Sequence, residues 1–208
     1  MIVLSHRGYW LKAEERNQRV AFERSFGLDF GTETDLRDAN GKIVISHDVP
    51  EGEVLDFSSF LNLYLSHAKG NLPLALNIKA DGLAGMVKST LAAFPELDAF
   101  VFDMAVPDMR AYFDCGIPVF TRMSEVEIQP CWLEQSAGIW LDSFGPTWFE
   151  TGLVGDLLAT GKRVCVVSPE LHGREPKPLW EMLTSHSSAG NLLLCTDRPE
   201  QARAFFRY

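Results

Sequence analysis

The chain has 208 residues, of which 46% are hydrophobic, and a formal net charge of −9 at pH 7. This length and composition suffice for one sizeable core, so we expect a single compact domain over residues 1–208. The negative charge argues against a nucleic-acid partner or an anionic membrane surface, because both would repel the chain. No apolar run approaches the roughly 18 residues of a membrane span, so we expect a cytoplasmic protein without stable membrane anchoring. Its oligomeric state stays open.

Short β-branched and aliphatic runs alternate along the chain with amphipathic stretches of helical length. The runs occupy 2–5, 31–36, 74–79, 99–103, 118–122, 139–142, 163–168 and 192–196. The helical stretches occupy 17–26, 57–68, 83–94, 107–115, 148–159 and 178–186, and after Arg122 only 131–135 has a helical pattern. This alternation indicates βαβ units with a parallel sheet, and eight such units can close into a barrel.

The sequence therefore predicts an α/β protein of the (β/α)8 TIM-barrel class. An open doubly wound sheet is the competing fold, but no G-x-G-x-x-G follows any of the strands. In a barrel of this class the catalytic groups gather at the carboxyl ends of the strands. The polar residues that end each predicted strand are therefore the candidates for a catalytic site.

Two carboxylates lie on the second predicted strand. Glu33 and Asp35 are two residues apart, so on a strand they project from the same face. Neighbouring carboxylates repel unless a cation lies between them, and oxygen ligands favour Mg²⁺ or Ca²⁺ over zinc. The Asn-Gly pair at 40–41 then predicts a hairpin, which would return His47 toward these carboxylates.

The first predicted strand ends on His6 and Arg7, and the third on Lys79. Imidazole titrates near neutrality, so His6 and His47 are candidates for accepting a proton from a nucleophile and donating one to a leaving group. Such a pair suits phosphoryl transfer. Arg7 and Lys79 would bind the non-bridging phosphate oxygens, and the metal would share the charge that develops there.

These motifs, in this order, resemble a known family. The segments are HRG at 6–8, N at 17, AF at 21–22, ETD at 33–35, DANGKIVISHD at 38–48, IK at 78–79 and LLLCTDRPEQA near the C-terminus. They resemble the glycerophosphodiester phosphodiesterases, within the superfamily of phosphatidylinositol-specific phospholipase C-like phosphodiesterases. The resemblance implies a TIM-barrel phosphoric diester hydrolase that uses a divalent metal, with His6 and His47 as acid/base groups. It also implies that Arg7 binds phosphate and that Glu33 and Asp35 bind the metal.

Two positions depart from the family pattern. Members usually carry a third acidic ligand two residues before the lysine, and this chain has Asn77 there. An amide oxygen can coordinate a metal but brings no charge, so we expect Asn77 to hold the metal less tightly. Where the family has Pro-Glu-Asn, this chain reads ERN at 15–17.

Several residues have weaker signals. Trp10 follows the HRG segment and is a candidate for contacting substrate, as is Arg122, which could instead pair with Asp103 or Asp142. Phe144 and Trp148 could line a pocket for glycerol, sugar or lipid, although such residues more often pack in a core. His172 could touch substrate, and we interpret Asp197 as a cap of the last helix.

Our leading hypothesis is a metal-dependent phosphodiesterase that acts on a glycerophosphodiester or similar small molecule. A catalytically silent relative that binds a phosphorylated ligand is the second, motivated by Asn77. A lyase or isomerase acting on a sugar phosphate is the third, because barrels host many reactions.

Overall fold

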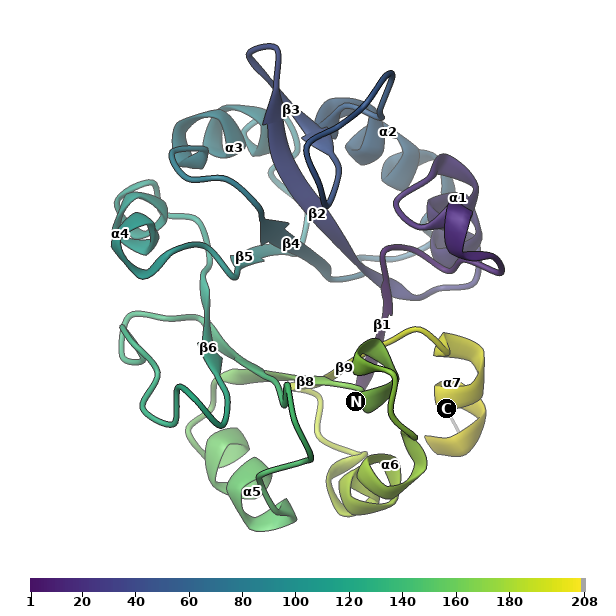
Figure 1. The fold of residues 1–208 in the computed structure, drawn as a ribbon, viewed down its shortest axis with the longest axis vertical. Coiled ribbons are helices and arrows are strands. Elements are labelled where there is room, and N and C mark those ends of the chain that lie inside the picture. The colour runs from purple at the N-terminus through teal and green to yellow at the C-terminus, as the bar shows by residue number, and fades with distance from the viewer. Residues whose placement is uncertain (207–208) are drawn as a thin grey trace. The chain divides into compact units, whose positions relative to one another are not determined.

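The computed structural model describes residues 1–206, and Figure 1 shows its fold. Its contacts group the chain into two compact units. Unit 1 comprises Met1–His6 and the chain from Phe120 onward, and unit 2 comprises Arg7–Val119. No helix in the described part of the chain is long and apolar enough to cross a bilayer.

Unit 2 contains a small sheet with helices on one face (Figure 1). Strands β2 (Gly31–Ala39), β4 (Leu74–Ile78) and β5 (Ala99–Phe102) pair in parallel, in the order β5-β4-β2. Strand β3 (Lys42–Ile45) pairs antiparallel with β2. The helices are α1 (Arg19–Gly27), α2 (Phe57–His67), α3 (Ala84–Leu91) and α4 (Val106–Asp114), and a 3-10 turn, η1 (Ala13–Glu15), precedes α1.

The core of unit 2 is rich in aromatic rings where α1 meets α2. Phe22 packs edge-on against Phe60 with ring centroids 4.7 Å apart, and Phe26 packs edge-on against Tyr64 at 5.2 Å. All four residues are buried. Edge-to-face pairs of this kind add to the stabilisation that burial of the rings already provides. Helix α2 starts at a defined residue, because the Asp56 carboxylate accepts a hydrogen bond from the Ser59 amide.

Unit 1 contains the other parallel strands. Strands β1 (Ile2–His6), β9 (Leu192–Thr196), β8 (Arg163–Val167), β7 (Gly138–Leu141) and β6 (Phe120–Met123) pair in parallel in that order. The connecting helices are α5 (Thr151–Ala159), α6 (Lys177–Leu183) and α7 (Pro199–Phe206), with 3-10 turns η2 (Pro169–His172) and η3 (Thr184–His186). The strands are buried almost throughout, as expected for parallel sheets covered by helices.

This element order confirms the predicted (β/α)8 class. Residues 1–206 contain eight parallel strands, six of the seven crossovers between them carry an α-helix, a seventh helix follows the last strand, and each predicted strand is present. The weak helical prediction at 131–135 is wrong, because this segment forms turns. Helix α1 begins at Arg19 and not at residue 17, because Asn17 has a left-handed backbone with φ of 58° and lies outside the helix.

A tight turn carries the chain out of β1. Arg7 and Gly8 both have left-handed backbones, with φ of 58° and 80°. An added Cβ at Gly8 would lie 2.9 Å from the backbone carbon of Ala21 in α1, closer than real contacts allow. Glycine is therefore required here both for its backbone conformation and for the approach of helix α1.

Replacing Gly8 should destabilise the protein through this close approach. We expect Gly8→Ala to lower the free energy of unfolding by about 1–3 kcal/mol, measured by urea denaturation. Gly82→Ala is the matched control, because Gly82 also has φ of 80° but an added Cβ meets nothing within 4 Å. It should cost about 1 kcal/mol. Equal losses in the two variants would contradict the role of the contact with α1.

Candidate functional site

One face of the unit 2 sheet carries a row of polar side chains. The register of β2 and β4 pairs Asp35 with Asn77, so these side chains are neighbours on adjacent strands. Glu33 precedes Asp35 by two residues and Lys79 follows Asn77 by two, which places both on the same face. The predicted shared face of Glu33 and Asp35 is thereby confirmed, because both lie within β2.

Asp35 is fully buried and is surrounded by donors. Its Oδ2 lies 2.9 Å from Arg7 Nε, and its Oδ1 lies 3.3 Å from Lys79 Nζ. Burial alone would raise the pKa of Asp35, but the charges of Arg7 and Lys79 hold this pKa below its usual range. A hydrogen bond from Asn17 and the proximity of His47 act in the same direction. Asp35 is therefore ionised at neutral pH.

Asn17 is a positioning residue that the sequence identified only as part of a motif. Its Nδ2 donates to Asp35 Oδ2 at 2.8 Å, and its Oδ1 accepts from the Thr34 hydroxyl at 2.9 Å. Its backbone N–H donates to the carbonyl of Arg7 at 3.0 Å. An asparagine just before a helix usually signals a cap, so local pattern alone could not reveal this contact with β2.

The hairpin returns His47 to this face, as predicted. Asn40 and Gly41, with φ of 50° and 74°, form the two-residue turn between β2 and β3. Beyond β3 the Ser46 amide donates to the carbonyl of Asp35 at 3.1 Å, which places His47 beside Asp35. The His47 side chain is 42% exposed, and its Nδ1 lies 3.0 Å from the carboxylate of Asp48.

The oxygen donors on this face fit a hard divalent cation. Glu33 is buried and its Oε2 accepts a hydrogen bond from the Arg7 amide at 3.1 Å. Asn77 Oδ1 is buried and has no hydrogen-bond partner among the described residues. A buried acceptor without a partner is costly, and a cation would satisfy it. Residues 1–206 contain no cluster of three or more His, Cys, Asp or Glu side chains arranged for a metal, so any site here depends on the amide of Asn77.

Unit 1 holds His6 at the end of β1. His6 Nδ1 lies 2.7 Å from Oδ1 of Asp197, which follows β9, and both side chains are largely buried. This pairing favours the tautomer with its proton on Nδ1, so the basic lone pair is on Nε2. Asp197 thus has a partner that its interpretation as a helix cap did not indicate. Glu170 supports it, because Glu170 Oε1 accepts from the Asp197 amide at 3.2 Å and from the Thr196 hydroxyl.

The structure also places the two weaker substrate candidates. In unit 2 the guanidinium of Arg16 lies 4.2 Å from the ring centroid of Trp10, so this cation covers one face of the indole. In unit 1 Arg122 Nε forms an ion pair with Glu127, a partner that the sequence did not suggest. The guanidinium of Arg122 also lies 5.5 Å from the ring centroid of Phe144.

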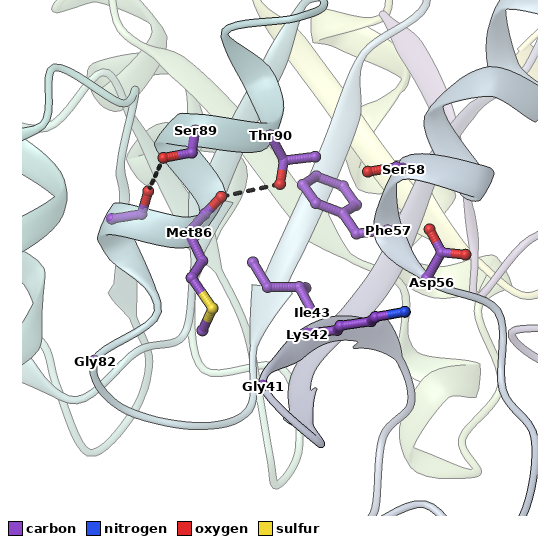
Figure 2. A pocket seen from close by; sticks show the side chains of 11 residues that line it. Gly41, Lys42, Ile43, Asp56, Phe57, Ser58, Gly82, Met86, Ser89 and Thr90 are labelled. Carbon is purple, nitrogen blue, oxygen red and sulfur yellow. Dashed lines mark hydrogen bonds between the residues drawn. The ribbon is translucent and has the colours of Figure 1, made fainter.

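A cavity of about 660 Å³ lies elsewhere in unit 2, between β3, α2 and α3. Figure 2 shows Ile43, Phe57 and Met86 around this space, with Lys42 extending on the side of Asp56. None of the predicted catalytic, substrate-binding or metal residues lines it. The cavity is therefore separate from the polar face of β2 and β4.

Comparison with solved structures shows a shared fold. A glycerophosphodiester phosphodiesterase from Parabacteroides distasonis matches with a TM-score of 0.74 and 16% identity, over 99% of this chain and 96% of that chain. One from Agrobacterium tumefaciens matches with a TM-score of 0.70 and 14% identity, over 98% and 99%. A phosphodiesterase from Oleispira antarctica, in complex with the product sn-glycerol-3-phosphate, matches with a TM-score of 0.67 and 15% identity, over 100% and 97%. No family model matches the chain, and no curated protein matches it.

The ion pairs of Asp35 should make stability depend on pH. A carboxylate whose pKa is lowered by folding stabilises the protein above its unfolded pKa, about 3.9, and loses this contribution as pH falls through the folded value. The difference in free energy of unfolding between wild type and Asp35→Asn should therefore be largest near pH 7 and shrink below about pH 4. Urea denaturation in a chelating buffer measures it. Asp38→Asn, on the exposed part of β2, should show no such trend, and a constant Asp35→Asn difference would contradict this account.

Proposed function

We propose that the protein is a metal-dependent phosphodiesterase that acts on a glycerophosphodiester or a similar small phosphodiester. The observation that carries this proposal is the row of groups around Asp35, where Arg7 and Lys79 lie beside the oxygen donors Glu33 and Asn77. The fold shared with glycerophosphodiester phosphodiesterases supports it, as does the glycerol-3-phosphate product bound to the Oleispira antarctica protein.

Charge balance explains why this face suits a phosphodiester and a metal together. Arg7 and Lys79 are about one-fifth exposed, so their remaining N–H groups can reach a ligand while each stays paired with Asp35. Their two positive charges are cancelled by Glu33 and Asp35. An anionic phosphodiester therefore needs further positive charge at this face.

A divalent cation, Mg²⁺ or Ca²⁺, would supply that charge when held by Glu33, Asp35 and Asn77, and would polarise the phosphoryl group. Arg7 and Lys79 bind the non-bridging oxygens and stabilise the charge that they gain in the transition state. The amide of Asn77 contributes an oxygen without charge. We therefore propose weaker metal binding than an acidic residue would give at this position.

Two histidines carry the proton transfers in this proposal. One accepts the proton of the attacking hydroxyl, and the other donates a proton to the oxygen of the leaving alcohol. His6 suits either role, because Asp197 fixes its tautomer and stabilises the imidazolium that forms. His47 is more exposed, and the hydrogen bond from the Ser46 amide to the carbonyl of Asp35 places it beside Asp35. Trp10 and Arg122 would contact the substrate outside the phosphate.

The neutral Asn77 also supports a second candidate function. A relative that has lost tight metal binding could still hold a phosphorylated ligand through Arg7 and Lys79. Such a protein would bind the ligand without turnover.

Removing either histidine should abolish most of the activity. We expect His6→Ala and His47→Ala each to lower kcat by about 10²–10⁴-fold on a panel of glycerophosphodiesters with Mg²⁺, Ca²⁺ or Mn²⁺, because each loses one proton transfer. His67→Ala is the control, since His67 lies on α2 and its ring contacts the carbonyl of Leu63. Wild-type rates from His6→Ala would refute the assignment, and diester binding without turnover by the wild type would favour the second candidate.

Restoring an acidic residue at position 77 should strengthen metal binding. We expect Asn77→Glu to lower the dissociation constant for Mg²⁺ or Ca²⁺ by about tenfold, about 1.4 kcal/mol, measured by calorimetry without substrate. Asn62→Glu adds the same charge on the exposed face of α2 and should leave this constant unchanged. Equal metal affinity in wild type and Asn77→Glu would contradict the placement of a metal at Asn77.

A further inference from the structure

A second group of polar and aromatic side chains lies at the ends of β7 and β8 in unit 1. Asp142 directly follows β7, and its Oδ1 lies 2.8 Å from Nε2 of His172 in η2. The ring of Phe144 contacts that of His172 edge-on, with centroids 5.6 Å apart. We call Asp142, Phe144 and His172, with the flanking Arg122, Glu125 and Arg174, the β7-loop cluster.

The loop that carries Phe144 is held rigidly. Glu125 accepts hydrogen bonds from the amides of Phe144 and Gly145, at 3.2 and 2.6 Å. Arg174 donates to the carbonyl of Ser143, and the indole N–H of Trp148 donates to the carbonyl of Asp142 at 2.8 Å. These bonds fix a phenylalanine whose side chain is nearly half exposed. A preorganised aromatic ring that faces solvent is typical of a binding surface, because the ring and its loop lose little conformational entropy when a ligand binds.

Two buried polar atoms of this loop and of the turn that contacts it have no hydrogen-bond partner among the described residues. They are the hydroxyl of Ser143, a residue that is 95% buried, and Nε of Arg174. Buried polar groups in native proteins are nearly always satisfied, so such atoms point to a ligand or a water. Both residues belong to the loop and turn that form the cluster, so the orphaned groups and the exposed ring occur together.

The charges in and around the cluster disfavour an anion as its occupant. Arg122 pairs with Glu127, Arg174 interacts with Glu125, and His172 pairs with Asp142. The pKa of His172 is raised above its usual value, chiefly by the hydrogen bond with Asp142. Burial and the charge of Arg174 oppose this increase in pKa, and the charge of Glu125 adds to it. Counting Glu127, the partner of Arg122, three carboxylates face two guanidinium groups and one imidazole, so the cluster together with Glu127 has no net positive charge in either state of His172. It offers donors, acceptors and an aromatic face to a neutral group.

The cluster shares an edge of the unit 1 sheet with His6. Strands β1, β9, β8 and β7 pair in parallel in that order, so their carboxyl ends lie along one edge. His6 ends β1, and the cluster follows β7 and β8. The end of a parallel sheet at which a proton-transferring residue lies is also where ligands bind.

We propose that Asp142, Phe144 and His172 bind the alcohol portion of the diester, and that they select a neutral, polyhydroxylated alcohol. This inference rests on the proposed phosphodiesterase function. The carboxylate of Asp142 and the imidazole of His172 hydrogen-bond to the hydroxyls, and the ring of Phe144 packs against the C–H face of the polyol. A site built to hydrogen-bond hydroxyls discriminates against an alcohol that lacks them, because its polar groups are then left unpaired.

The test compares three esters of glycerol phosphate that differ in the second alcohol, which is inositol, ethanol or ethanolamine. We expect Phe144→Ala and Asp142→Asn each to lower kcat/KM for the inositol ester about tenfold and to change it less than twofold for the other two esters. Phe144→Tyr should retain most of the activity. Trp132→Ala is the matched control, since Trp132 is a similarly exposed aromatic residue of unit 1 outside the cluster.

Other outcomes overturn the proposal. An equal loss with all three esters would indicate a general structural role, and a loss confined to the ethanolamine ester would indicate a cation site. If the wild type turns over none of the esters, the phosphodiesterase function fails, and binding of free inositol measured by saturation-transfer NMR tests the cluster alone. A signal that is present in wild type and lost in Phe144→Ala would support the cluster as a polyol site, and the same signal in both, or none in wild type, would refute it.

Discussion

The burial of one negative charge organises unit 2. Asp35 has no exposure to solvent, so its charge must be balanced by partners inside the protein. Those partners come from three separate segments, namely Arg7 after β1, Asn17 before α1 and Lys79 after β4. Removing one partner of a buried ion pair typically costs about 3–5 kcal/mol. Arg7 and Lys79 are also the cations that we propose bind phosphate, so in this proposal stability and ligand binding depend on one set of contacts.

Unit 1 contains two histidine–aspartate pairs at strand ends. His6 and His172 each pair with an aspartate that follows a parallel strand, and in each case other groups hold the aspartate or its loop in place. A histidine paired in this way has a defined tautomer and a fixed ring. In our proposals His6 transfers a proton and His172 binds the ligand, because the ring of His172 contacts the exposed ring of Phe144. The similarity of the two pairs thus does not imply a shared role.

Periodicity in the sequence was enough to predict the strands, the class of fold and the hairpin that returns His47. These features depend on local patterns, such as alternating apolar runs and the Asn-Gly turn. The partners of Asp197, Arg122 and Asn17 could not be predicted, because each contact joins residues brought together by strand register or by a loop. The helix expected at 131–135 does not form, because a short apolar pattern does not distinguish a helix from consecutive turns. The chemical roles of His6, His47 and the metal donors stay proposals.

The two-residue turn at Asn40 and Gly41 has a consequence for the order of folding. Hairpins close within about 1–10 μs, because their contacts are short-range in sequence. We therefore expect Asp35 and His47 to meet early. Asn77 and Lys79 reach Asp35 only when β4 pairs with β2 across the intervening helix α2, and such non-local parallel pairing is slow. Until β4 docks, Asp35 lacks its ion pair with Lys79, so we expect the pairing of β4 with β2 to complete the polar face of unit 2.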